Sequence, residues 1–153
     1  MLNSTDLQYI KVTQLHASLE TDAVPDEVNA EFSVADINVQ GAEHYVRVSV
    51  AHAARFFTAE ETVAHISFVH SAHFKYRADE PPTRPVLEAW VKENVYFMIY
   101  PYVRETLQSA CGQLGLPAMV LGYLNRGEVI PRTIAVVVSN TRFDQSITAP
   151  DDE

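Results

Sequence analysis

The hydrophobic residues in the first half of the chain alternate with polar ones, as they do in strands of a sheet with one buried face. The alternation is clearest in residues 43–57, where Val46, Val48 and Val50 share one side. Three more segments alternate, the first of them only loosely: 7–20, 28–40 and 63–78. Since short connections join the four segments, the sequence predicts an antiparallel sheet over residues 7–78, with a meander as its simplest topology.

The first of these segments assigns its side chains to two faces. Strict alternation puts Ile10 and Val12 on one face of the strand, and Tyr9, Leu15 and Leu19 on the other.

The period changes after the proline-rich residues 79–85. A helical stripe follows, with apolar residues at i, i+4, i+7, i+8 and i+11: Val103, Leu107, Ala110, Cys111 and Leu114. Gly112 and Gly115, followed by a proline, mark the end of this helix. The pattern predicts a helical region over residues 83–114, in which Pro101 lies near a helix start or at a kink.

Residues 95–103 are apolar on every side of that helix. One side of a helix can cover the sheet, but the opposite side then needs a second partner. The preceding short helix or loops could supply it. A second copy of the chain is the more economical partner, because large exposed apolar patches are rare. The predicted interface residues are Val95, Met98, Ile99, Tyr102 and Val103.

The last quarter of the chain is predicted to be mostly extended. Residues 116–140 form an apolar, extended segment, of which 132–140 read as a fifth strand or an extended stretch. Residues 141–153 end in acids and are expected to be a mobile tail. The prediction is therefore one α+β domain over residues 1–153.

The charge and composition narrow the possible partners. The net charge is -9, which makes nucleic acid a poor partner because its phosphates would be repelled. The longest apolar run is far short of the ~20 residues that cross a bilayer, and the first residues do not resemble a signal peptide. These features predict a cytoplasmic protein without direct membrane insertion. Cys111 has no second cysteine with which to form an internal disulfide.

The sequence offers no convincing catalytic or metal site. His65 and His73 are eight residues apart on a predicted strand and His70 points to the other face, so one metal ion cannot bind all three. Cys111 lies on the apolar helix stripe and is expected in the core. No nucleophile, phosphate-binding or zinc motif is found in the sequence. We therefore expect no enzyme activity, no metal and no cofactor.

The motif "YPYVRE" at residues 100–105, followed by "GQLGLPAMVL" at 112–121, resembles the signature of the SecB family of export chaperones. Upstream, "YVRVSVAHAA" (45–54) and "AHFKYR" (72–77) fall where that family has its third and fourth strands. The resemblance covers residues 7–124.

The resemblance implies a SecB-like fold: a four-stranded antiparallel sheet followed by a long helix. It also implies a homotetramer built as a dimer of dimers. Its function would be to hold unfolded preproteins in apolar grooves without ATP and to pass them to the SecA motor. The candidate groove residues are Phe56, Phe57, Phe74, Tyr76, Trp90, Leu116, Met119, Leu121 and Tyr123.

The sequence departs from the family at two places. Residues 122–140 do not resemble the second helix that covers the family's groove. The positions that correspond to the family's acidic motor-docking residues fall near His16, Glu20 and Ser67, of which only Glu20 is acidic. Some SecB-like proteins serve instead as dedicated chaperones of an antitoxin in a toxin–antitoxin system, and this is the alternative function. A small-molecule carrier is a third, weaker hypothesis.

Overall fold

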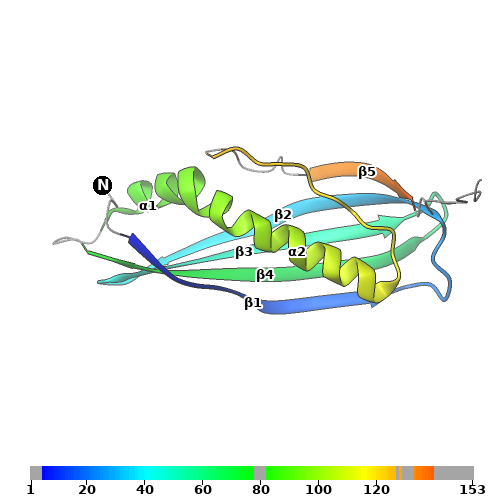
Figure 1. The fold of residues 1–153 in the computed structure, drawn as a ribbon, viewed down its shortest axis with the longest axis horizontal. Coiled ribbons are helices and arrows are strands. Elements are labelled where there is room, and N and C mark those ends of the chain that lie inside the picture. The colour runs from blue at the N-terminus through cyan, green and yellow to red at the C-terminus, as the bar shows by residue number, and fades with distance from the viewer. Residues whose placement is uncertain (1–4, 78–81, 127, 129–132, 140–153) are drawn as a thin grey trace, which may run out of the picture.

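The chain folds into one sheet covered on a single face by a long helix and an extended segment (Figure 1). The computed structural model describes residues 5–77, 82–126, 128 and 133–139. The predicted acidic tail, 141–153, lies outside these residues. The elements are β1 (Thr5–Leu19), β2 (Glu27–Gly41), β3 (Tyr45–Phe57), β4 (Thr62–Tyr76), α1 (Arg84–Trp90), the π-helical segment η1 (Val91–Val95), α2 (Tyr96–Leu114) and β5 (Thr133–Ser139).

The sheet has five antiparallel strands in the order β1-β4-β3-β2-β5. The α+β fold is therefore as predicted, with β5 added at one edge. The meander is wrong for the first strand, because β1 pairs with β4 and not with β2. Residues 20–26 join β1 to β2, which are three strand spacings apart, or roughly 15 Å. Seven residues reach that far, so the short connection does not force a hairpin.

Two irregularities in β1 change the faces to which its side chains belong. The register against β4 shifts between Leu7 and Tyr9 and again between Val12 and Gln14. Each bulge inserts one residue and reverses the alternation. The predicted faces are therefore confirmed for Ile10, Val12 and Tyr9 but wrong for Leu15 and Leu19. Five large apolar side chains share the face that carries the helix: Leu7, Ile10, Val12, Leu15 and Leu19.

The helical region runs without a break from Arg84 to Leu114. The predicted stripe is confirmed, since Val103, Leu107, Ala110 and Cys111 are buried. Only one of the two glycines ends the helix. Gly115 has φ 69 and is the C-cap, whereas Gly112 lies inside α2. Pro101 is the sixth residue of α2 and follows the π-helical turn, two features that commonly bend a helix.

The segment after α2 turns back along the helix and covers the other half of the sheet face (Figure 1). Leu116, Met119 and Leu121 are buried there. The Tyr100 hydroxyl donates a hydrogen bond to the Gly122 carbonyl and so ties the segment to α2. Residues 116–126 and 133–139 contain no helix, as the sequence predicted.

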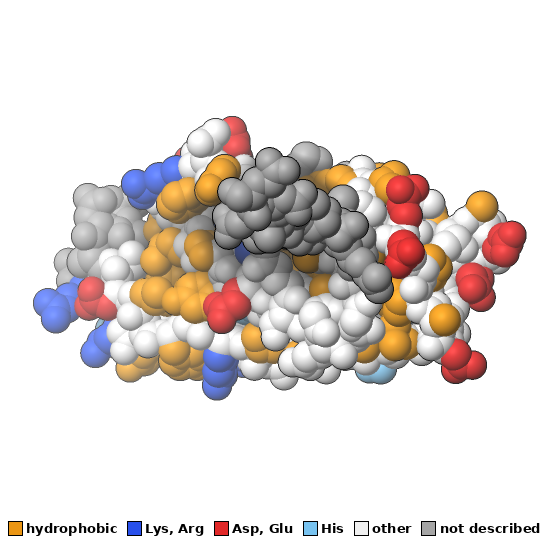
Figure 2. Space-filling model, turned by 45° about the vertical axis from the view of Figure 1, so that its right-hand side comes forward, with side chains coloured by type: hydrophobic (Ala, Val, Ile, Leu, Met, Phe, Trp, Pro, Cys, Tyr) orange, Lys and Arg blue, Asp and Glu red, His pale blue; other side chains and the backbone are white. Residues whose placement is uncertain are grey.

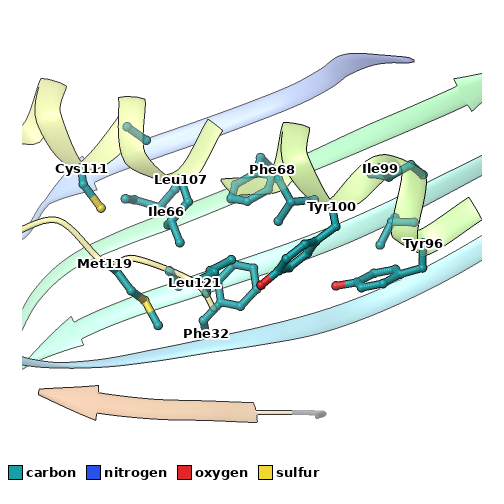
Figure 3. Packing of buried hydrophobic residues seen from close by; sticks show 14 of the residues in the cluster. Phe32, Ile66, Phe68, Tyr96, Ile99, Tyr100, Leu107, Cys111, Met119 and Leu121 are labelled. Atoms are coloured by element: carbon teal, nitrogen blue, oxygen red, sulfur yellow. The ribbon is translucent and has the colours of Figure 1, made fainter. Parts of the chain in front are cut away.

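The core lies between the sheet and this second layer. Figure 3 shows Phe32, Ile66 and Phe68 of the sheet facing side chains of α2 and of residues 116–121. These three are at most 1% exposed, and burying such a side chain stabilises a fold by about 1.5–3 kcal/mol.

Candidate functional site

An apolar strip on the helix-facing side of β1 remains uncovered. We use "apolar strip" for Leu7, Ile10, Val12, Leu15 and Leu19. Leu15 is 52% exposed, and Leu7, Val12 and Leu19 are 39–42% exposed. β1 is also an edge strand, so within the described part of the chain one side of its backbone has no neighbouring strand. The molecule thus presents unburied apolar side chains beside an open strand edge.

Two hollows lie between this strip and the helices. The first, of about 620 Å³, is lined by Leu7, Phe74, Trp90, Phe97 and Met98, among others. Its base includes the edge-to-face contact of Phe74 with Trp90, whose ring centroids are 4.9 Å apart.

The second hollow, of about 370 Å³, continues along the strand. Its apolar lining includes Ile10, Val12 and Leu15 of β1 with Tyr102 and Ala110 of α2. The two hollows together follow β1 from Leu7 to Leu15, which is roughly 25 Å at the rise of a strand. That length matches an extended segment of seven or eight residues.

The predicted interface residues fall into two groups. Val95, Ile99 and Val103 are 0% exposed and belong to the chain's own core, so they present no surface to a second copy. Met98 and Tyr102 are 37% and 45% exposed, and Phe97, which the prediction left out, is 40% exposed. The outward side of α2 is therefore narrower than the apolar run suggests.

The predicted groove residues are also divided. Six of the nine are buried within the chain: Phe56, Phe74, Tyr76, Leu116, Met119 and Leu121. Two of these still line hollows. Phe74 contributes to the first hollow together with the half-buried Trp90, and Tyr76 lines a separate hollow of about 470 Å³. Phe57 lies under the Arg55 guanidinium, 4.3 Å from its ring centroid, away from both hollows.

Tyr123, the last of the nine, is 95% exposed and lies beside Arg104 of the family-like motif. The guanidinium is 5.3 Å from the Tyr123 ring centroid, and Nε of Arg104 has no hydrogen-bond partner within the described chain. Arg104 thus faces the extended segment.

The β1 residues that line the hollows were missed by the sequence analysis. Leu7, Val12 and Leu15 were assigned to a strand without any role in a groove. The available signal was the poor alternation of residues 7–20, which indicates bulges rather than a weak strand.

Two buried histidines lie beneath α2. His52 Nε2 is 3.0 Å from the Tyr96 hydroxyl, and His70 Nε2 is 2.9 Å from Thr106 Oγ1. Burial lowers the pKa of His52 to about 3 and that of His70 to about 4, so both rings are neutral at pH 7. Burial likewise raises the pKa of the Cys111 thiol, which suits a core residue and not a nucleophile.

Over residues 5–77, 82–126, 128 and 133–139, no group of three or more histidine, cysteine or acidic side chains could hold a metal ion. No helix in the same part of the chain is long and apolar enough to cross a membrane.

The opposite face of the sheet carries His16 and Ser67, two of the three positions that the sequence resemblance aligned with motor docking. His16 of β1 lies directly across from Ser67 of β4, and both line a hollow of about 280 Å³ that also includes Ala35, Ala51 and Ala53. Glu20 is exposed just past the end of β1, with Ser18 donating a hydrogen bond to it. No acidic side chain lines this hollow.

Exposed acids gather at the end of the molecule where β1 connects to β2 and β3 connects to β4. Figure 2 shows acidic side chains at one end of the visible face and hydrophobic patches farther along it. The residues at these two connections are Glu20, Asp22, Asp26, Glu27, Glu60 and Glu61.

Comparisons with known proteins bear on the resemblance to the SecB family. No protein-family model matches the chain. Two curated proteins match, each 36% identical over 74 residues: the SecB-like chaperone Rv1957 of Mycobacterium tuberculosis strain ATCC 25618 / H37Rv and the SecB-like chaperone MT2006 of strain CDC 1551 / Oshkosh. The match spans 45% of this chain and 41% of the relatives' length.

A solved structure is similar over a longer range. It is the Mycobacterium tuberculosis Rv1957 SecB-like chaperone in complex with a ChAD peptide from the Rv1956 HigA1 antitoxin. The likeness covers 80% of this chain and 92% of that one, with a TM-score of 0.70 and 24% identity. The resemblance to the SecB family is thereby confirmed: the chain has a SecB-like fold and is similar in sequence to SecB-like chaperones over 45% of its length.

Proposed function

We propose that this protein is an ATP-independent chaperone that holds an extended apolar segment of a client chain, and that its client is an antitoxin. The observation that carries the proposal is the apolar strip, which lies beside an open strand edge and two hollows. An extended client can pair with a free strand edge while its apolar side chains enter neighbouring pockets. The proposal assigns no catalytic step to the chain.

The antitoxin replaces general export as the leading hypothesis for the client. Its support is the similar SecB-like chaperone Rv1957, which was solved with an antitoxin peptide. General export is the second candidate, and handing over preproteins to SecA would need a docking face. The outer sheet face carries His16 and Ser67 at two of the three expected acidic positions, which weakens that candidate. A toxin–antitoxin gene pair beside this gene would favour dedicated use.

We also propose that the protein acts in the cytoplasm as a homotetramer. Met98 and Tyr102, with Phe97, would contact another copy, since all three are exposed and apolar on the outward side of α2. Because Phe97 and Met98 also line the first hollow and Tyr102 lines the second, the second copy would border the client groove.

A light-scattering assay with a slow-folding client tests the holding activity. Stoichiometric wild-type protein should suppress aggregation without nucleotide. The Leu15→Glu variant should lose most of that activity, because it puts a charge into the second hollow. Gln14→Glu is the matched control, since it adds the same charge one residue away on the opposite face of β1. Unchanged aggregation in the presence of the wild type would contradict the proposal.

The preference for a dedicated client is tested separately. The wild type and the same two variants should be titrated with the ChAD peptide of the HigA1 antitoxin and with a reduced, unfolded model protein. Dedicated use predicts tighter binding of the antitoxin, and a weaker affinity for it in Leu15→Glu but not in Gln14→Glu. Equal affinities for the two clients would restore general holding as the leading hypothesis.

A further inference from the structure

β5 is attached to the molecule through one neighbour in the sheet. It pairs with β2 from Ser33 opposite Thr133 to Glu27 opposite Ser139. Val136 and Val137 are 40% and 62% exposed, and only Val138 is buried. Ile134 is partly buried against the core, so two side chains of β5, Ile134 and Val138, pack there. The rest of the attachment is the backbone ladder with β2, and elements with few buried apolar contacts open most easily.

The composition of β5 resembles that of an apolar segment that becomes exposed when a protein unfolds. Its sequence, TIAVVVS, has no charge and no proline, and five of its seven residues are β-branched. Natural edge strands usually carry lysine, proline or a bulge that prevents further pairing. β5 has none of these over residues 133–139, and its apolar side chains occupy both faces of the strand.

The edge of β2 that receives β5 lies next to a bulge. Over the described residues the ladder with β5 runs from Glu27 to Ser33, and β2 has a bulge against β3 between Val34 and Asp36. A bulge commonly terminates pairing. Two acids lie along the receiving edge, with Glu27 opposite Ser139 and Glu31 opposite Ala135. Glu31 already forms an ion pair with Arg55 of β3 at 3.3 Å, so an incoming basic residue would share that carboxylate. An extended segment with basic residues at those two positions would gain cross-strand attraction that β5 itself lacks, chiefly from Glu27.

We propose that the Glu27–Ser33 edge of β2 is a second binding site for an extended client segment, and that β5 occupies this edge until the client displaces it. The partner is a β-branched, extended segment with basic or neutral residues opposite Glu27 and Glu31. This inference rests on the proposed holding function, because it concerns a further surface for the same class of client.

A reversible crosslink tests the displacement. Asn29 and Val137 lie opposite each other on the outer face, so Asn29→Cys with Val137→Cys can lock β5 onto β2. Gln40→Cys with Arg47→Cys is the matched control, since it locks β2 to β3 without touching β5. The probe is a fluorescent synthetic peptide with the sequence of residues 133–139 and flanking lysines. We call the disulfide between the cysteines at positions 29 and 137 the β5 lock. Oxidation that closes this lock should abolish peptide binding, and reduction should restore it. The control disulfide between positions 40 and 47 should leave peptide binding unchanged.

Removing β5 should have the opposite effect. A chain that ends at residue 128 should bind the peptide about tenfold or more tightly than the full chain, because a tethered competitor has an effective concentration of about a millimolar. Equal binding by the full chain with the β5 lock closed and open would overturn the inference. That comparison uses the complete chain and decides the matter even if the shortened chain is unstable.

The charges on the peptide test which edge is used. Lysine at the positions that match Ala135 and Ser139 should strengthen binding relative to glutamate there, and the Glu27→Gln, Glu31→Gln double variant should reduce that difference. Equal affinity of the two peptides would overturn the assignment to this edge. Suppression of client aggregation that is unaffected by the β5 lock would contradict the inference and leave the proposed function intact. Failure of the wild type in that assay would instead contradict the proposed function.

Discussion

The Tyr96 hydroxyl lies 3.0 Å from Nε2 of His52 inside the core, which joins α2 to the central strand β3. The His52 ring also stacks on Phe32 at 5.3 Å and on Phe68 at 5.4 Å between ring centroids. An imidazole in such apolar surroundings is stable only when neutral. The contact between sheet and helix therefore depends on pH.

We predict that acid destabilises the protein through these histidines. The pKa of His52 falls from 6.5 to about 3 on folding, so below pH 6.5 the unfolded state binds a proton that the folded state does not. Stability is thus complete above pH 6.5 and is lost as the pH falls toward 3. The whole loss from His52 alone is on the order of 5 kcal/mol, of which about 3 kcal/mol falls between pH 7 and pH 4. Urea unfolding between pH 7 and pH 4 measures it.

A double variant isolates this effect. Replacing both His52 and Tyr96 with phenylalanine removes the titrating ring and its hydroxyl partner together. Removing both partners of a buried hydrogen bond costs far less than removing one. We expect a markedly flatter stability profile below pH 6.5. The slope that remains is assigned to His70, whose pKa is also lowered, to about 4. An unchanged slope would show that His52 does not control acid sensitivity.

Replacing each of the two glycines near the C-terminal end of α2 with alanine should change the free energy of unfolding in opposite directions. Gly115 has φ 69, a left-handed conformation that costs an L-residue roughly 1–2 kcal/mol. Gly115→Ala should lower the free energy of unfolding by about that amount. Gly112 is helical, with no atom within 4 Å of an added Cβ, so Gly112→Ala should raise the free energy by roughly 0.5–1 kcal/mol. Chemical denaturation of both variants checks the signs, and equal changes would contradict the assigned C-cap.

We predict that a charge on the outward side of α2 dissociates the oligomer without unfolding the chain. Met98 is 37% exposed in the single chain, so Met98→Glu costs the isolated fold little. Burying that carboxylate without a partner between two copies would cost several kcal/mol. Sedimentation should show a smaller species with an unchanged circular dichroism spectrum. Gln108→Glu, on an exposed polar position of α2, is the control, and a monomeric wild type would refute the prediction.

We predict weak, salt-sensitive binding to SecA or none, while the holding activity persists. Glu20 is the only acid at the three expected docking positions, and one exposed carboxylate contributes on the order of 1 kcal/mol at most. His16 and Ser67, which face each other on the outer sheet face, add no negative charge near neutral pH. Calorimetric titration with SecA at two salt concentrations, with Glu20→Gln as the comparison, measures this. Tight binding that salt does not weaken would place the docking face elsewhere.

The sequence by itself determined the features that depend on neighbouring residues. The spacing of Val103, Leu107, Ala110 and Cys111 gave the buried side of α2, because residues four apart on a helix share a face. The YPYVRE motif identified the SecB-like fold. The apolar character of residues 95–103 was also plain, although it could not say which side faces the sheet.

Only the tertiary structure decided which of those apolar residues remain exposed. It placed Val95, Ile99 and Val103 inside and left Met98 and Tyr102 outside. It also joined β1 to β4, a pairing between residues 45 to 71 positions apart that no local pattern encodes. The two bulges in β1 then brought Leu7 and Leu15 onto the face of Ile10 and Val12. Because each inserted residue reverses the alternation, the candidate site is visible only once the partner strand fixes the register.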